Sequence, residues 1–149
     1  MEFVYTTYIK ATPEKVWDVL TQREFTKQYF FGQNINSDWE RGSTVTFTMG
    51  DGDTAVVGKV LEVNRPEHLS YTWTVPGDDT PRENPTYVIF KLKQVKSEVK
   101  LTLWHKSLVP TDITEREDTF YGLNNGWPAI LSNLKTLLET GEPLDALKF

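Results

Sequence analysis

Residues 43–63 read STVTFTMGDGDTAVVGKVLEV, and this stretch decides the fold class. Val45, Phe47 and Met49 alternate with threonines, which is the period of a half-buried β-strand. Residues 50–53 then carry an Asp-Gly pair typical of a hairpin turn, and residues 55–63 supply the returning strand. The stretch therefore predicts an antiparallel sheet with one face on the core.

The same two-residue period recurs elsewhere along the chain. Residues 2–10 are rich in aromatic and β-branched types, and alternation returns in residues 69–75, 86–93 and 99–106. A turn at 64–67 and a loop rich in Pro, Gly and Asp at 76–85 separate these segments. We therefore expect a sheet of about six to seven antiparallel strands.

Two short helices are predicted after the first strand. Thr12 can cap the first helix, Pro13 suits its first turn, and Glu14 complements the positive end of the helix dipole. A second helix is expected over residues 24–30, closed by Gly32.

The helical period returns after Pro110, in an apolar stripe that runs from Phe120 to Leu138. Thr114 and Glu117 have the spacing of a capping box, and Gly141 stands where a C-terminal cap belongs. Pro128 interrupts the pattern, because it lacks the amide hydrogen that a helix interior needs. The pattern favours one long helix kinked at Pro128, the alternative being a shorter helix followed by one that starts near Trp127.

Helices segregated from an antiparallel sheet define an α+β fold, and both apolar faces are buried if the sheet curls around the final helix. The length of 149 residues suits a single domain, 1–149, with one sizeable core. Sixteen basic against 21 acidic residues argue against nucleic-acid binding. No apolar run is long enough to span a membrane, and cysteine is absent. We expect a soluble, cytoplasmic protein that does not insert into membranes.

Residues 13–21, PEKVWDVLT, resemble the first-helix signature of the family named for the activator of the heat-shock-protein-ninety ATPase (AHSA-like). Further matching segments are QYFFG at 28–32, SDWERG at 37–42, GKVLEV at 58–63 followed by Pro66, LSYTW at 69–73, and GWPAILSNLKTLLETG at 126–141. These segments cover nearly the whole chain in the family's order. The compact form is similar to the single-domain bacterial members.

The resemblance implies the START-like (SRPBCC) superfamily and its helix-grip fold, with a curved sheet wrapped around a long C-terminal helix and a hydrophobic cavity between them. Proteins on this scaffold include lipid carriers, hormone receptors, cyclases and co-chaperones, so the fold alone does not define function.

Nineteen aromatic rings make the interior the best candidate for a ligand site. We expect residues from the short helices, the inward sheet phase and the final helix to converge there. The predicted ligand-binding residues are Trp17, Phe25, Tyr29, Phe30, Phe47, Tyr71, Trp73, Phe90, Leu103, His105, Trp127 and Leu131. The alternative for each ring is a solid core. Trp39 and Trp104 are expected on the outer sheet phase, where exposed rings would suit a partner or a dimer.

Catalytic groups are sparse. His68 is expected in a solvated turn, and His105 either contacts a ligand or is satisfied by its neighbours. Asp51 and Asp53 lack the spacing of a calcium loop, and two histidines without cysteine make a metal site improbable. We predict no catalytic residue, no metal and no cofactor.

The leading hypothesis is therefore non-enzymatic binding of a small hydrophobic or amphipathic molecule, lipid-like or polycyclic, in the cavity between sheet and helix. Residues 122–128 and 76–85 are candidate gates. One alternative is a chaperone-associated or stress-response module whose partner is a chaperone or a second copy of the chain, as a homodimer. The other is a cyclase- or hydratase-type enzyme that uses the same cavity.

Overall fold

Seven antiparallel strands form one sheet in the computed structural model, which describes residues 1–147. Their order is β1-β7-β6-β5-β4-β3-β2. The strands are β1 Phe3–Ile9, β2 Asn34–Asn36, β3 Thr44–Thr48, β4 Thr54–Asn64, β5 His68–Trp73, β6 Thr86–Val95 and β7 Glu98–Lys106. The predicted antiparallel sheet of about six to seven strands is confirmed.

The β3–β4 hairpin follows the sequence pattern closely. Val45 and Phe47 are buried, and the turn uses Gly52 at a φ of 95° with the Asp53 amide donating to Asp51 Oδ1 at 3.0 Å. Met49 is 39% exposed, so its predicted inward position is wrong. The cause is a register shift between Phe47 and Thr48, after which β3 ends.

Two further strand expectations need correction. β5 ends at Trp73, and Val75, predicted to continue its inward phase, is exposed. His68 was expected in a solvated turn but begins β5, where it is half-buried and lies 3.1 Å from the Glu62 carboxylate. Trp104 does lie on the outer phase, opposite Val4 and Ile89 on the neighbouring strands.

The two short helices are confirmed as α1 Pro13–Thr21 and α2 Arg23–Tyr29. Thr12 caps α1, since its hydroxyl accepts a hydrogen bond from the Lys15 amide at 3.2 Å. Their apolar sides face the sheet, and Trp17 and Tyr29 are both buried.

The long C-terminal helix is α3, Leu123–Thr140, with Gly141 in the left-handed conformation at its end, as predicted. Pro128 lies inside this one helix, which starts before Trp127 and after Phe120. The capping box at Thr114 and Glu117 is wrong. The Asn124 side chain instead bonds the Thr114 backbone through both its amide oxygen and nitrogen, at 3.0 and 2.7 Å, and holds residues 114–121 as a loop.

Trp39 and β2 depart from the sequence expectation. β2 is a three-residue strand with one buried apolar residue, Ile35, and it was not predicted. Trp39, expected on the outer sheet face, instead packs against the core with its ring 6.0 Å from that of Tyr71. Its indole nitrogen donates to the Thr21 carbonyl at 3.0 Å, which fixes the loop after β2 against the end of α1.

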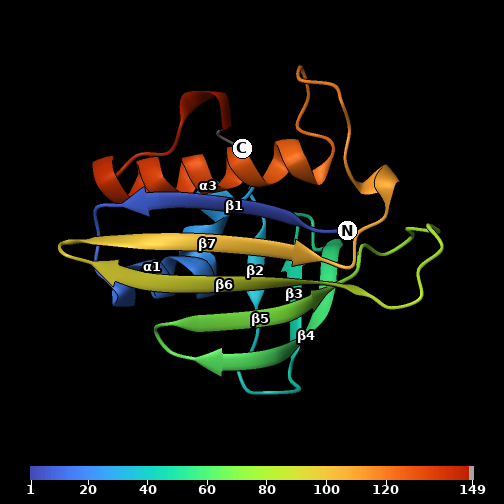
Figure 1. Ribbon diagram of the computed structural model, residues 1–149, viewed down its shortest axis with the longest axis horizontal. Coiled ribbons are helices and arrows are strands. Elements are labelled where there is room, and N and C mark those ends of the chain that lie inside the picture. The colour runs from blue at the N-terminus through green and yellow to red at the C-terminus, as the bar shows by residue number, and fades with distance from the viewer. Residues whose placement is uncertain (148–149) are drawn as a thin grey trace.

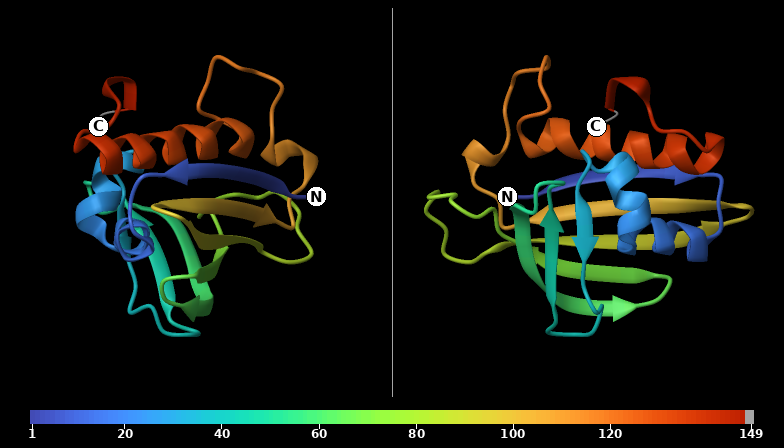
Figure 2. Two further views of the ribbon diagram at one scale, coloured as in Figure 1. Left: turned by 60° about the vertical axis from the view of Figure 1, so that its left-hand side comes forward. Right: turned by 180° about the vertical axis from the view of Figure 1, so that it is seen from behind.

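The sheet curves around one core, and α3 runs along its open side (Figure 1). Figure 2 shows α1 and α2 on the same concave side, beside β2 and β3. Lys135 of α3 donates to the Tyr8 carbonyl of the edge strand β1 at 2.7 Å. The architecture is thus the predicted α+β helix-grip arrangement. The short 3-10 turns η1 Pro110–Asp112 and η2 Asp145–Leu147 flank α3.

Candidate functional site

The middle of the interior, between the sheet and α3, is filled by side chains. The rings of Phe30 and Phe47 stack at 4.6 Å, and the hydroxyl of buried Tyr29 donates to the Val19 carbonyl at 2.8 Å. The gap among these residues has no volume that could hold a water molecule. The structure therefore differs from the expected interior slot, because the stacked and edge-on rings interlock as they do in a close-packed core.

Open volume occurs instead at one end of this core, in a pocket of about 700 Å³. Phe30, Trp73 and Trp127 form part of its wall, and His105 lies beside them. The ring centroids of Trp73 and Trp127 are 5.2 Å apart. Loop 76–85, η1 and the start of α3 border the opening. The volume lies in the range of small-molecule sites, whose walls are mostly apolar.

His105 is fixed by two hydrogen bonds. The Trp127 indole nitrogen donates to His105 Nδ1 at 3.0 Å, which requires Nδ1 to be unprotonated. His105 Nε2 therefore carries the hydrogen and donates to the Thr86 hydroxyl at 2.9 Å. The Thr86 hydroxyl in turn donates to the Trp73 carbonyl, also at 2.9 Å. Burial lowers the pKa of His105 from 6.5 to about 4, so the imidazole is neutral near pH 7.

Arg82 forms an ion-pair clasp at the pocket mouth. Its guanidinium donates to both carboxylate oxygens of Asp112 at 2.8 and 2.6 Å, and to Asp78 at 3.2 Å. The bonds to Arg82 lower the pKa of Asp112. Hydrogen bonds from Thr80 and Arg82 lower the pKa of Asp78. The clasp connects loop 76–85 to η1, and its two carboxylates neutralise the positive charge of the guanidinium.

Two further features complete the pocket. Gln33 Oε1 in the wall is buried and has no hydrogen-bond partner within residues 1–147. On the outer side, the rings of Phe31 and Phe120 lie 5.6 Å apart, and Tyr121 is 84% exposed. An unpaired buried acceptor is costly in a folded protein, and large exposed rings at a pocket mouth are typical of binding sites.

The structure divides the twelve predicted site residues into three groups. Four line the open pocket: Phe30, Trp73, His105 and Trp127. Tyr29, Phe47, Tyr71, Phe90 and Leu131 surround the filled interior instead. Leu103 is a buried sheet residue between Tyr5 and Phe90, Trp17 is buried on α1, and Phe25 lies under the Lys15 ammonium, 4.3 Å from its ring centroid.

Sequence reasoning missed the polar and loop residues of the pocket. Gln33, Arg82, Thr86 and Asp112 belong to segments that carry no recognised motif. Loop 76–85 was singled out only as a candidate gate, and it does border the pocket. A usable signal was present in the clustering of acidic residues at 78–83 and 112–118.

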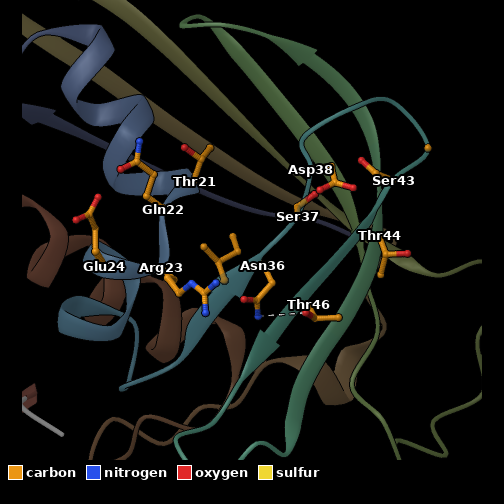
Figure 3. Close-up of a pocket in the computed structure, with 12 residues that line it drawn as sticks. Thr21, Gln22, Arg23, Glu24, Asn36, Ser37, Asp38, Ser43, Thr44 and Thr46 are labelled. Atoms are coloured by element: carbon orange, nitrogen blue, oxygen red, sulfur yellow. Dashed lines mark hydrogen bonds between the residues drawn. The ribbon is translucent and has the colours of Figure 1, made fainter.

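A second hollow, about 830 Å³, lies between the α1–α2 junction and the β2–β3 region (Figure 3). Its labelled residues are polar, among them Arg23, Asp38 and Thr46, and the Asn36 amide donates to the Thr46 hydroxyl. It is a groove with threonine, serine and charged walls, without the aromatic lining of the pocket beside His105. Within residues 1–147 no group of three or more His, Asp or Glu residues is placed to hold a metal ion, and no helix is long and apolar enough to cross a bilayer.

A curved antiparallel sheet gripping a C-terminal helix, with a pocket at one end of their shared core, defines a START-like (SRPBCC) helix-grip protein. The match of residues 10–139 to a family model makes the assignment narrower. The chain belongs to the family described as "Activator of Hsp90 ATPase homolog 1-like protein". Comparison with curated protein sequences gives no match.

Solved structures of similar proteins share the fold over nearly their whole length. A protein from Cytophaga hutchinsonii is 29% identical with a TM-score of 0.73, covering 95% of each chain. The Aha1 dimer from Colwellia psychrerythraea is 22% identical, with a TM-score of 0.72 over 95% of this chain and 98% of that one. An HSP90 activator from Plasmodium falciparum is 21% identical, with a TM-score of 0.71 over 96% and 98%.

Proposed function

We propose that this protein binds a small hydrophobic or amphipathic molecule, lipid-like or polycyclic, in the pocket beside His105, without chemical conversion. The observation that carries the proposal is an aromatic-walled hollow of about 700 Å³ that continues the core to the surface. Burial of apolar ligand surface there gains roughly 25 cal/mol per Å², less the cost of ordering the ligand. Loops 76–85 and 113–122 and the start of α3 would adjust around the ligand.

Binding without catalysis is supported by the state of His105. Both of its ring nitrogens are engaged, one by Trp127 and one by Thr86. A general base needs a free nitrogen within reach of the substrate proton. The cyclase- or hydratase-type alternative would require this network to break. The proposal includes a cytoplasmic location.

The test is a titration of the protein with an aromatic probe such as naphthylmethanol. Trp73 and Trp127 line the pocket, so we expect bound probe to change tryptophan emission and to raise the melting temperature. Gly126→Leu adds a side chain to the pocket wall, where a Cβ meets only the Phe120 carbonyl at 3.4 Å, and should weaken binding about tenfold or more. Gln94→Leu, an exposed position near the end of β6 that lies away from the pocket residue Thr86, is the control. Equal binding by both variants would place the probe elsewhere and contradict the proposal.

A second candidate function is a chaperone-associated interaction module. It is favoured by the family description and by the HSP90 activator from Plasmodium falciparum among the similar structures. The measurement is the ATPase rate of an Hsp90 with and without this protein. An unchanged rate over a full concentration series would count against the module.

A second copy of the chain is the other partner to test, since the protein from Colwellia psychrerythraea is a dimer. The exposed outer sheet face around Val4 and Trp104 is the surface we propose for such contact. Sedimentation that stays monomeric at high concentration would exclude it.

A further inference from the structure

The net charge of the protein is concentrated at one place. The chain carries 21 acidic and 16 basic residues, a net charge of −5. Segments 76–85 and 109–122 together hold seven of the acidic residues and two of the basic ones, which gives these segments a charge of −5. The rest of the chain has 14 acidic and 14 basic residues, so its net charge is zero. The acidic residues concerned are Asp78, Asp79, Glu83, Asp112, Glu115, Glu117 and Asp118. We call these two segments the acidic rim.

The two segments of the acidic rim border the mouth of the pocket. Figures 1 and 2 show the loop between β5 and β6 and the loop before α3 at the same end of the molecule. Both contribute to the pocket wall, the first through Asp78 and Arg82 and the second through Asp112 and Tyr121. A hollow with apolar walls and a mouth of net negative charge focuses the electrostatic potential and concentrates ligands of positive charge.

The pocket wall offers no free cation to an anionic ligand. Among residues 1–147 that line it, Arg82 is the single one charged positively at neutral pH, and two carboxylates already hold its guanidinium. A fatty-acid carboxylate would therefore meet a net negative mouth and would have to displace Asp112 from Arg82. That displacement would leave a partly buried carboxylate without its partner.

The remaining wall suits a positive charge. The faces of tryptophan, tyrosine and phenylalanine rings attract cations within about 6 Å, most strongly where water is excluded. The pocket has six such rings: Phe30, Phe31, Trp73, Phe120, Tyr121 and Trp127. Gln33 Oε1 adds a hydrogen-bond acceptor that lacks a donor within residues 1–147.

From this combination of rim charge and aromatic wall we propose that the ligand is an organic cation, an apolar or aromatic body that bears a protonated amine or a quaternary ammonium group. The body occupies the wall formed by Phe30, Trp73 and Trp127, and the cationic group faces the acidic rim. This inference rests on the proposed function, because it names the ligand class of the same pocket.

The test compares three probes with one aromatic body: the naphthylmethylammonium cation, neutral naphthylmethanol and anionic naphthoate. Dissociation constants are measured by tryptophan emission at neutral pH and low ionic strength. We expect the ammonium probe to bind about tenfold more tightly than the alcohol, and naphthoate to bind more weakly than both. The preference for the ammonium probe should shrink in about 1 M salt, where the screening length is about 3 Å.

A matched pair of variants assigns the preference to the acidic rim. The first replaces four exposed rim residues that do not line the pocket, by Asp79→Asn, Glu83→Gln, Glu115→Gln and Glu117→Gln. The second makes the same change in net charge elsewhere, by Glu24→Gln, Glu40→Gln, Glu67→Gln and Glu142→Gln. We expect the first to lose most of the ammonium preference and to keep its affinity for naphthylmethanol, and the second to behave as the natural protein.

The outcomes separate the two proposals. Binding of naphthylmethanol that equals or exceeds that of the ammonium probe would overturn the cation inference and leave the hydrophobic pocket intact. So would an equal loss of preference in both variants. Failure of all three probes to bind would overturn the proposed pocket function, and the cation inference with it.

Discussion

Gly58 in β4 is a position where only a hydrogen fits. A Cβ built there would lie 1.8 Å from the Thr72 carbonyl oxygen and 2.7 Å from its carbonyl carbon, and both atoms are backbone. The Lys59 amide also donates to the Thr72 hydroxyl at 2.8 Å, so β4 and β5 approach each other closely at this point. The β4–β5 ladder is irregular around Gly58, since Val57 pairs with Thr74 only as an isolated bridge and the regular pairing begins at Val60.

Gly58→Ala should therefore destabilise the protein by more than about 2 kcal/mol, because backbone, unlike a side chain, cannot rotate away from the added methyl group. Gly50→Ala is the control, since a Cβ there has nothing within 4 Å. The free energy of unfolding by denaturant measures both. Equal stability of the two variants would show that β4 and β5 are not in close contact at Gly58.

His105 should make stability depend on pH. Its pKa is about 4 in the folded protein, against an ordinary value of 6.5, because burial disfavours the charged ring. Asp112, Arg82 and the Trp127 indole N–H face or neighbour the ring. Above pH 6.5 the imidazole is neutral in both states, and its contribution is fully present. As the pH falls from 6.5 to about 4, only the unfolded chain takes up the proton, and roughly 3 kcal/mol is lost.

The measurement is the free energy of unfolding against pH for the natural protein and for His105→Gln, which should show a flatter slope between pH 6.5 and 4. Resonances of the His105 ring give an independent readout, since they should not titrate until about pH 4. A ring that protonates near 6.5 would contradict the described network.

At the scale of elements, the pocket depends on loops that are held by side chains. Arg82 joins loop 76–85 to η1, and Asp112 also accepts from the Val109 amide at 2.9 Å. Asn124 holds the loop before α3 through its bonds to Thr114. The shape of the pocket mouth is therefore set by a few polar contacts, which have lower local stability than the strands.

Arg82→Met should release loop 76–85 and η1 without unfolding the sheet. The amide hydrogens of residues 76–85 and 109–112 should exchange about tenfold faster, since a charged hydrogen bond to a partly buried carboxylate contributes roughly 1–3 kcal/mol. Arg116→Met removes a comparable pair with Asp118, but its side chains are 68% and 76% exposed, and we expect no change in exchange. Unchanged exchange in Arg82→Met would mean that the clasp does not hold the loops.

Helices and strands were predictable from the sequence where the hydrophobic pattern continued over many residues and gave the element one apolar and one polar face. The strands around Phe47, Leu69 and Leu101 and the caps at Thr12 and Gly141 carried local signals, and all of them formed. The start of α3 was missed because Asn124 bonds the Thr114 backbone, ten residues away, in place of the local capping box. β2 was missed because three residues with a single apolar side chain are too few to show a period, and its position depends on pairing with β3.

The candidate site was less predictable for a related reason. The aromatic residues were identified by type and phase, but whether rings interlock or leave a space depends on their relative angles, such as the 28° between Phe30 and Phe47. Those angles follow from tertiary packing, which a single sequence does not display. Both nitrogens of His105 likewise find partners, Thr86 and Trp127, that lie 19 and 22 residues away.

At the scale of the whole molecule, charge is segregated. The acidic rim repels itself, whereas the rest of the protein is balanced and gains from attraction between opposite charges. Such segregation costs stability and is retained where it serves recognition. The cost gives a prediction that does not depend on any ligand.

The rim variant that replaces Asp79, Glu83, Glu115 and Glu117 should be more stable than the control variant that replaces Glu24, Glu40, Glu67 and Glu142, although both carry the same net charge. Removing rim carboxylates relieves repulsion, while removing the others unbalances a neutral surface.

The difference in free energy of unfolding should be about 0.5–1 kcal/mol at low ionic strength, the size of a few exposed charge interactions. It should vanish in about 1 M salt, where such charges are screened. Equal stability of the two variants at low salt would mean that solvent already screens the rim, and a pocket mouth with so weak a potential could not select a cation by its charge.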